Sequence, residues 1–113
     1  YVSLPMPTTW VSGNVKVKIY YRCNAAASNN VYWQIGYAKY DSAASMNPSL
    51  TTTTVASTLN GTANTLNVTE FTITVGATNV AAMLDLAISR LGADPLDTNS
   101  DTVGVRMVVV ELG

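Results

Sequence analysis

The sequence predicts an all-β domain, folded as an antiparallel sandwich of two sheets. Three observations lead to this prediction. Apolar and polar residues alternate with a period of two in several segments, which is the pattern of a strand with one buried face. Short signals rich in Asn, Gly and Ser separate these segments, as expected of turns between strands. The length of 113 residues fits a single domain covering 1–113.

The two most regular strands are expected at 14–23 and 31–40, joined by an Asn- and Ala-rich loop. The inward set of the first is Val15, Val17, Ile19 and Tyr21, and its outward set is Lys16, Lys18, Tyr20 and Arg22. The inward set of the second is Val31, Trp33, Ile35 and Tyr37, and its outward set is Tyr32, Gln34, Ala38 and Tyr40. Each segment therefore predicts a strand with one core face and one wet face.

Further strands are expected at 52–58, 67–75, 82–90 and 103–112. The pair Asn60-Gly61 favours a tight hairpin turn, because both central positions of such a turn need positive φ, so a strand should resume at 62–66. In the last strand we expect four side chains to face inward, while Arg106 and Val108 face outward. The four are Val103, Val105, Met107 and Val109. About eight strands in a chain of this length suit a two-sheet jelly roll.

The segment 79–91 leaves an alternative open. Its apolar residues also fit the i, i+3, i+4 spacing of a short helix. We favour a strand here, because the neighbouring segments are strands separated by short turns.

Composition excludes several classes of function. Hydrophobic residues make up 48% of the chain and charged residues only 12%, against about 25% in an ordinary domain. A net charge of −1 leaves no basic face for nucleic acid. No apolar run approaches the ~20 residues that span a bilayer. The surface must be rich in Thr, Ser and Asn, which suits packing against neighbouring proteins.

No enzyme chemistry is indicated. The chain has no histidine, so no Ser-His-Asp or Cys-His arrangement exists, and no glycine-rich phosphate loop or zinc-ligand spacing occurs. We expect no cofactor. The single cysteine, Cys23, is interpreted as a core residue. The chain begins at Tyr1, which we expect of a processed product or of part of a longer protein.

The loop 94–101 contains the only acidic cluster. Asp97, Asn99 and Asp101 alternate as at the start of a calcium loop, but the Gly and distant Glu of that motif are missing. The alternative, which we favour, is a solvated turn in which Asp and Asn side chains bond their own backbone. Arg90 precedes the loop and could pair with Asp94, Asp97 or Asp101 to hold it in place.

Three tyrosines are predicted on outward faces: Tyr20, Tyr32 and Tyr40. Exposed aromatic rings on neighbouring strands form protein interfaces or stack on sugar rings. We favour an interface with a protein neighbour over sugar binding.

Four stretches resemble a family of short jelly-roll domains in tailed-phage structural proteins. They are a Pro-x-x-Trp loop leading into a strand (7–20), an apolar-x-Trp strand start (30–35), the segment 86–90 with its Asp-rich loop to 102, and the closing strand 103–107. The resemblance implies a jelly-roll module on a virion, such as a capsid decoration protein or a fibre or tail domain, often a homotrimer. It implies that Trp10 and Trp33 are core anchors and that Arg90 pairs with Asp101.

Two other functions stay open, because a fold does not fix function. A carbohydrate-binding module would use Tyr20, Tyr32 or Tyr40 as a stacking platform. A self-assembling capsid or filament subunit would instead show apolar interfaces on more than one face.

Overall fold

The computed structural model describes residues 2–6, 13–41, 50–75 and 82–112, and these residues form seven strands. In chain order they are β1 (Val2–Met6), β2 (Gly13–Cys23), β3 (Asn30–Asp41), β4 (Thr51–Thr58), β5 (Leu66–Val75), β6 (Ala82–Arg90) and β7 (Val103–Leu112). Within the described residues there is no helix, and so none long and apolar enough to cross a membrane.

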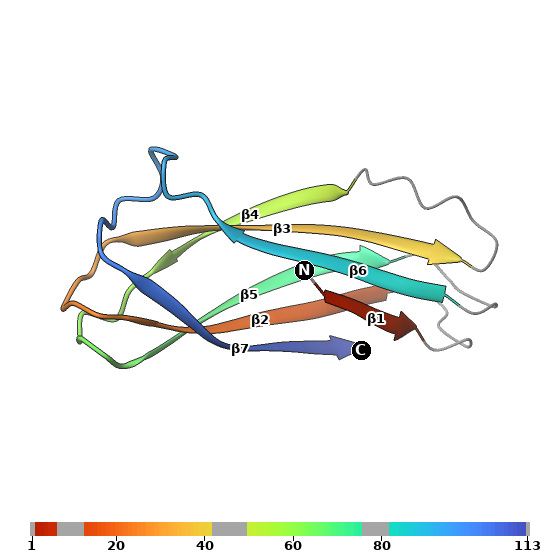
Figure 1. Cartoon of the computed structure of the whole chain (residues 1–113), viewed down its shortest axis with the longest axis horizontal. Coiled ribbons are helices and arrows are strands. Elements are labelled where there is room, and N and C mark those ends of the chain that lie inside the picture. Colours follow the sequence, from red (N-terminus) through yellow and green to blue (C-terminus); the bar gives the residue numbers. More distant parts are fainter. Residues whose placement is uncertain (1, 7–12, 42–49, 76–81, 113) are drawn as a thin grey trace.

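The strands form two antiparallel sheets arranged as the layers of a sandwich (Figure 1). The order is β1-β6-β3-β4 in the four-stranded sheet and β5-β2-β7 in the three-stranded sheet. Only the link between β3 and β4 joins successive strands of the same sheet; each other link carries the chain to the opposite sheet. The predicted all-β antiparallel sandwich is confirmed, whereas an eighth strand and the jelly-roll order stay predictions.

The inward faces of the two sheets make one hydrophobic core. The alternation read from the sequence is strict in β5, where every second residue from Asn67 to Val75 is buried. The same alternation buries the predicted inward residues of β2, from Val15 to Tyr21. The buried apolar residues are Met6, Val15, Val17, Ile19, Tyr21, Cys23, Val31, Trp33, Ile35, Leu59, Phe71, Ile73, Val75, Leu84 and Leu86.

A polar contact inside this core links the two sheets. The Tyr21 hydroxyl on β2 lies 2.5 Å from the Ser57 hydroxyl on β4. The Tyr21 ring also meets the Trp33 ring edge-on, with centroids 5.2 Å apart. A buried hydroxyl without a hydrogen-bond partner destabilises the fold. The contact with Ser57 therefore allows the large Tyr21 ring to be buried in the core with its hydroxyl satisfied.

The described part of the segment that also fitted a helix is a strand. Residues 82–90 form β6, which pairs with β1 on one side and with β3 on the other. Leu84 and Leu86 are buried in the core. Pairing on both sides satisfies the backbone of β6, and this overrides the helical spacing of its side chains.

The predicted hairpin at Asn60-Gly61 is wrong. β4 and β5 belong to different sheets, and residues 62–65 are not a strand. Positive φ occurs at Gly61 and Asn64 instead of at two adjacent positions. The Asn60 side chain shapes this wider link, because its amide donates to the Leu66 carbonyl and its oxygen accepts from the Thr62 backbone. A wider link is required to reach the opposite sheet.

The predicted facing of β7 is only partly right. The register against β2 shifts between Tyr20 and Tyr21, which leaves Arg106 without a partner, as in a β-bulge. The extra residue reverses the alternation. Val103 and Val108 therefore pack against the core, whereas Met107 pairs with the outward Tyr20.

Candidate functional site

The end of β6 carries a paired arginine. Arg90 lies opposite Trp33 of β3, and its guanidinium binds both oxygens of Asp97 at 2.8 Å. The same guanidinium donates to the backbone carbonyls of Asn99 and Asp101. Arg90 thus satisfies one buried carboxylate and two loop carbonyls at once.

Asp97 ties the loop after β6 to β3. Its side chain is 0% exposed, and it also accepts hydrogen bonds from the backbone N–H groups of Tyr32 and Asn99. The Arg90 hydrogen bonds, reinforced by the one from Tyr32, hold the pKa of the Asp97 carboxyl below its usual range despite the opposing effect of burial. Asp97 is therefore the ionised centre of a structural network.

The rest of the loop is bonded to the start of β3. Thr98 and Asn99 donate their backbone N–H groups to the Asn30 carbonyl, and the Thr98 hydroxyl accepts from the Asn30 N–H. The Asn29 side chain donates to the Thr98 carbonyl. These hydrogen bonds fix the conformation of the loop against the start of β3.

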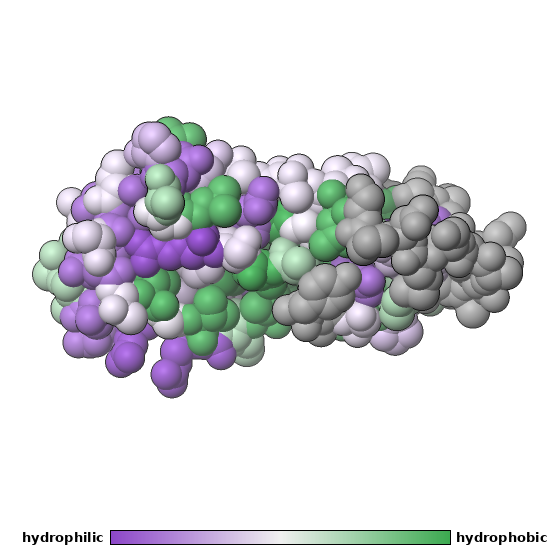
Figure 2. Space-filling model, turned by 45° about the horizontal axis from the view of Figure 1, so that its top comes forward, coloured by the Kyte–Doolittle hydropathy of each residue, from purple (hydrophilic) through white to green (hydrophobic). Residues whose placement is uncertain are grey.

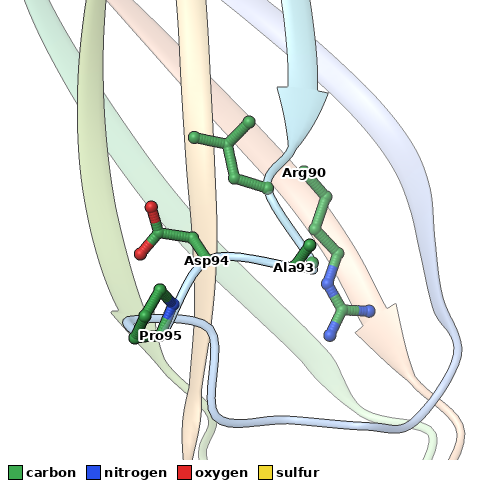
Figure 3. A pocket seen from close by; sticks show the side chains of 6 residues that line it. Arg90, Ala93, Asp94 and Pro95 are labelled. Carbon is green, nitrogen blue, oxygen red and sulfur yellow. The ribbon is translucent and has the colours of Figure 1, made fainter.

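The expected pairing of Arg90 with Asp101 holds only through the backbone. Arg90 donates to the Asp101 carbonyl, while its carboxylate partner is Asp97. Asp94 takes no part, because its carboxylate accepts from the Leu96 N–H and points away from Arg90 (Figure 3). Spacing alone does not choose among three nearby aspartates.

The weak calcium candidates Asp97, Asn99 and Asp101 do not form a cation site. Both Asp97 oxygens accept from Arg90, and the Asn99 side-chain oxygen accepts from the Asp101 N–H. A cation would have to compete with a guanidinium at the same oxygens. Across the part of the chain that the structure describes, no group of three or more Cys, Asp or Glu residues is placed to hold a metal.

A pocket of about 630 Å³ borders this loop (Figure 3). It is lined by Arg90, Leu91, Gly92, Ala93, Asp94 and Pro95. The guanidinium of Arg90 is already bound to Asp97, and Asp94 bonds its own turn. Among the described residues that line it, Asp94 is the one charged group without an ion-pair partner, so the hollow offers a ligand an apolar wall and a single carboxylate.

The three outward tyrosines do not share a surface. Tyr20 lies on the outer face of the three-stranded sheet, opposite Val68 and Met107. Tyr32 and Tyr40 lie on the outer face of the other sheet, eight residues apart on β3. Eight residues of strand span about 26 Å. The structure therefore builds no continuous aromatic platform from these three rings.

Of the two tryptophans, the structure describes Trp33. Trp33 is buried against Tyr21, in the core position that the resemblance implied. Trp10 lies outside the described residues. Cys23 is buried, and the Asn99 side-chain amide donates to its sulfur at 3.6 Å.

An apolar row crosses the outer face of the three-stranded sheet. Val68, Tyr20 and Met107 are direct cross-strand neighbours on β5, β2 and β7, and Leu66 continues the row on β5. Val68 is 48%, Met107 52% and Leu66 58% exposed. We call Leu66, Val68, Tyr20 and Met107 the outer apolar row.

Sequence reasoning found only Tyr20 of this row. Val68 carried a usable signal, because it is an apolar residue at an outward position of an alternating strand. Met107 carried none, since the bulge that turns it outward is not visible in the pattern.

The outer apolar row sits between two groups of charges. On one side Lys18 binds Glu111 at 2.9 Å, and Lys16 lies 4.0 Å from Glu70. On the other side are Arg22, the next outward residue of β2, and Arg106 of the bulge. An apolar centre with a charged rim is the usual anatomy of a protein interface.

No protein-family model, curated protein or solved structure matches this chain.

Proposed function

We propose that this protein is a non-enzymatic structural module of a virus particle, such as a capsid decoration, fibre or tail module, which acts through protein–protein contacts. The outer apolar row is the observation that carries this proposal. Leu66, Val68 and Met107 are about half exposed and lie beside Tyr20 on three strands, and Leu96 and Val105 are the other large apolar side chains of the described residues that are equally exposed. Contiguous exposed apolar surface of this kind favours a protein partner.

The partner that we propose for this surface is a further copy of the chain, in a homotrimer. The face of three strands measures roughly 30 by 14 Å, or about 420 Å². A stable interface usually buries about 800 Å² per partner. The contact must therefore extend beyond this face, around the free edge of β7, where Val105 is 49% exposed. Figure 2 shows a group of hydrophobic residues in the middle of the side of the molecule that it presents.

The location on a virus particle rests on the resemblance of the four sequence stretches to phage jelly-roll domains. The low charge of the chain supports it, because 12% charged residues suit a subunit that is held among neighbours. Detection of peptides of this chain in density-purified particles would support the location. Their absence from the particles, together with their presence in the particle-free fraction, would contradict it.

Glycan binding is less well supported by the geometry. A sugar platform needs neighbouring rings on one surface, and Tyr20 lies on the opposite face from Tyr32 and Tyr40. The Tyr32 hydroxyl is already bonded to Thr54.

Light scattering at several protein concentrations tests the proposed assembly. We expect the mass of a trimer for the wild type and the mass of one chain for Met107→Glu, because a carboxylate in the row would be desolvated. Ser89→Glu is the matched control. It adds the same charge at an exposed position of β6, on the outer face of the other sheet, and should leave the trimer intact.

Two results would contradict the proposal. The first is a wild type with the mass of one chain at every concentration. The second is equal dissociation of both variants, which would place the interface elsewhere. Assemblies that grow without limit would instead favour a capsid or filament subunit. Circular dichroism of both variants shows that the fold persists.

A further inference from the structure

Two arginines line a small pocket at one end of the three-stranded sheet. Arg22 of β2 and Arg106 of β7 border it together with Asn64, Thr65 and Leu66, and its volume is about 320 Å³. We propose that this pocket binds an oxyanion, that is a carboxylate, sulfate or phosphate group. The inference goes beyond the proposed assembly and is tested separately from it, although Leu66 belongs to both surfaces.

The pairing of β2 with β7 and the bulge in β7 bring the two arginines to the same pocket. Arg22 lies opposite Leu66 on β5 and Gly104 on β7. Arg106 is the extra residue of the bulge, two positions further along β7. Bulges commonly redirect a side chain towards a site. Without the extra residue, β7 would continue its alternation and Met107 would not occupy the outward position beside Tyr20.

The pocket has unbalanced positive charge. None of the described residues that line it is acidic. The carboxylates of this sheet, Glu70 and Glu111, lie beside Lys16 and Lys18 instead. Among the described residues neither Arg22 nor Arg106 has an ion-pair partner. Two free guanidiniums at one hollow attract an anion and repel each other until one arrives.

The lining also indicates the kind of ligand. Guanidinium groups present a planar fork of donors that matches carboxylate, sulfate and phosphate oxygens. The exposed Asn64 lines the same pocket and carries an amide that can donate, whereas the Thr65 hydroxyl is already committed to Asn60 and Thr62. Leu66 is apolar and 58% exposed. A ligand with an oxyanion next to an apolar portion fits these groups best.

Titration of the labelled protein with sodium sulfate, followed by NMR, tests the proposal. Inorganic phosphate and acetate in parallel titrations distinguish the sources of the oxyanion. We expect saturable shifts of the backbone amides at 64–66 and 104–106. Arg22→Gln and Arg106→Gln should each weaken binding about tenfold or more, because each removes charge-assisted hydrogen bonds.

Lys16→Gln is the matched control, because it removes one positive charge from the outer face of the same sheet, beyond the outer apolar row. It should leave the affinity within about twofold, as expected when a screened charge is lost. Shifts that do not saturate, or an equal loss of affinity in all three variants, would overturn the proposal. Unchanged amide spectra elsewhere in the variants show that the fold is intact. The mass in solution is a separate readout, so a failed assembly and a failed anion site are distinguishable.

Discussion

Arg90 and the pair Arg22 and Arg106 show opposite uses of the same side chain. Arg90 binds the fully buried carboxylate of Asp97 and two loop carbonyls. Arg22 and Arg106 line an open pocket that has no acidic residue among its described lining residues. In the first arrangement the charges of Arg90 and Asp97 neutralise each other, so the pair stabilises the fold. In the second arrangement the positive charges of both guanidinium groups remain available to a ligand. Two unpaired cations side by side do not stabilise a fold, so their placement favours a binding role.

The largest effect should follow from breaking the paired site. Asp97→Ala should lower the free energy of unfolding by about 3–5 kcal/mol, because it leaves a partly buried guanidinium without its carboxylate. Urea denaturation measures the change. Asp94→Ala is the control, since Asp94 only accepts from the Leu96 N–H, and it should cost about 1 kcal/mol or less. Similar losses in both variants would show that the Arg90–Asp97 pair has no special role.

Acid should weaken the same site in the wild type. The folded state lowers the pKa of Asp97, so the stability that its ionised form contributes is present above the pKa of the unfolded chain. This contribution is lost as the pH falls below about 4 and through the lower folded pKa. The stability difference between wild type and Asp97→Asn should therefore shrink as the pH falls from 7 towards 2. A difference that stays constant would mean that the pKa of Asp97 is not lowered by folding.

Asp101→Ala should have a much smaller effect. Arg90 uses the Asp101 carbonyl, and alanine keeps that carbonyl. We expect a loss within about 1 kcal/mol, with any faster amide exchange confined to the loop between β6 and β7. A loss of stability as large as that of Asp97→Ala would instead support the pairing of Arg90 with the Asp101 carboxylate that the resemblance implied.

The smallest effect is expected at the unpaired site. Arg22→Gln and Arg106→Gln should each change the free energy of unfolding by no more than about 0.5 kcal/mol, because both side chains are exposed and form no ion pair with any other described residue. A marked loss of stability in thermal or urea unfolding would mean that these arginines hold the fold, as Arg90 does.

The sequence predicted the sandwich because alternation records burial directly. β2, β3, β5 and β6 lie within a few residues of their predicted ranges, and the inward residues predicted for β2 and β3 were identified correctly. What failed were features that depend on long-range register. The Asn60-Gly61 hairpin was wrong because β4 and β5 belong to different sheets, and local turn preference does not contain sheet identity.

The candidate sites were less predictable for the same reason. Arg90 and its acidic loop could be named, but the choice of Asp97 depends on how the loop reaches the Tyr32 N–H. The outer apolar row and the Arg22–Arg106 pocket both depend on the bulge in β7. A bulge moves every later side chain to the other face, and a single sequence gives no sign of it.

Hydrogen–deuterium exchange at low and high protein concentration tests the central claim, that the outer face of the three-stranded sheet with its edge strand β7 is the assembly surface. Association should slow exchange of β7 amides at high concentration, because contact there shields the exposed edge. Exchange at β4, one of the two edge strands of the other sheet, should not change. Protection at β4 with no change at β7 would contradict the account.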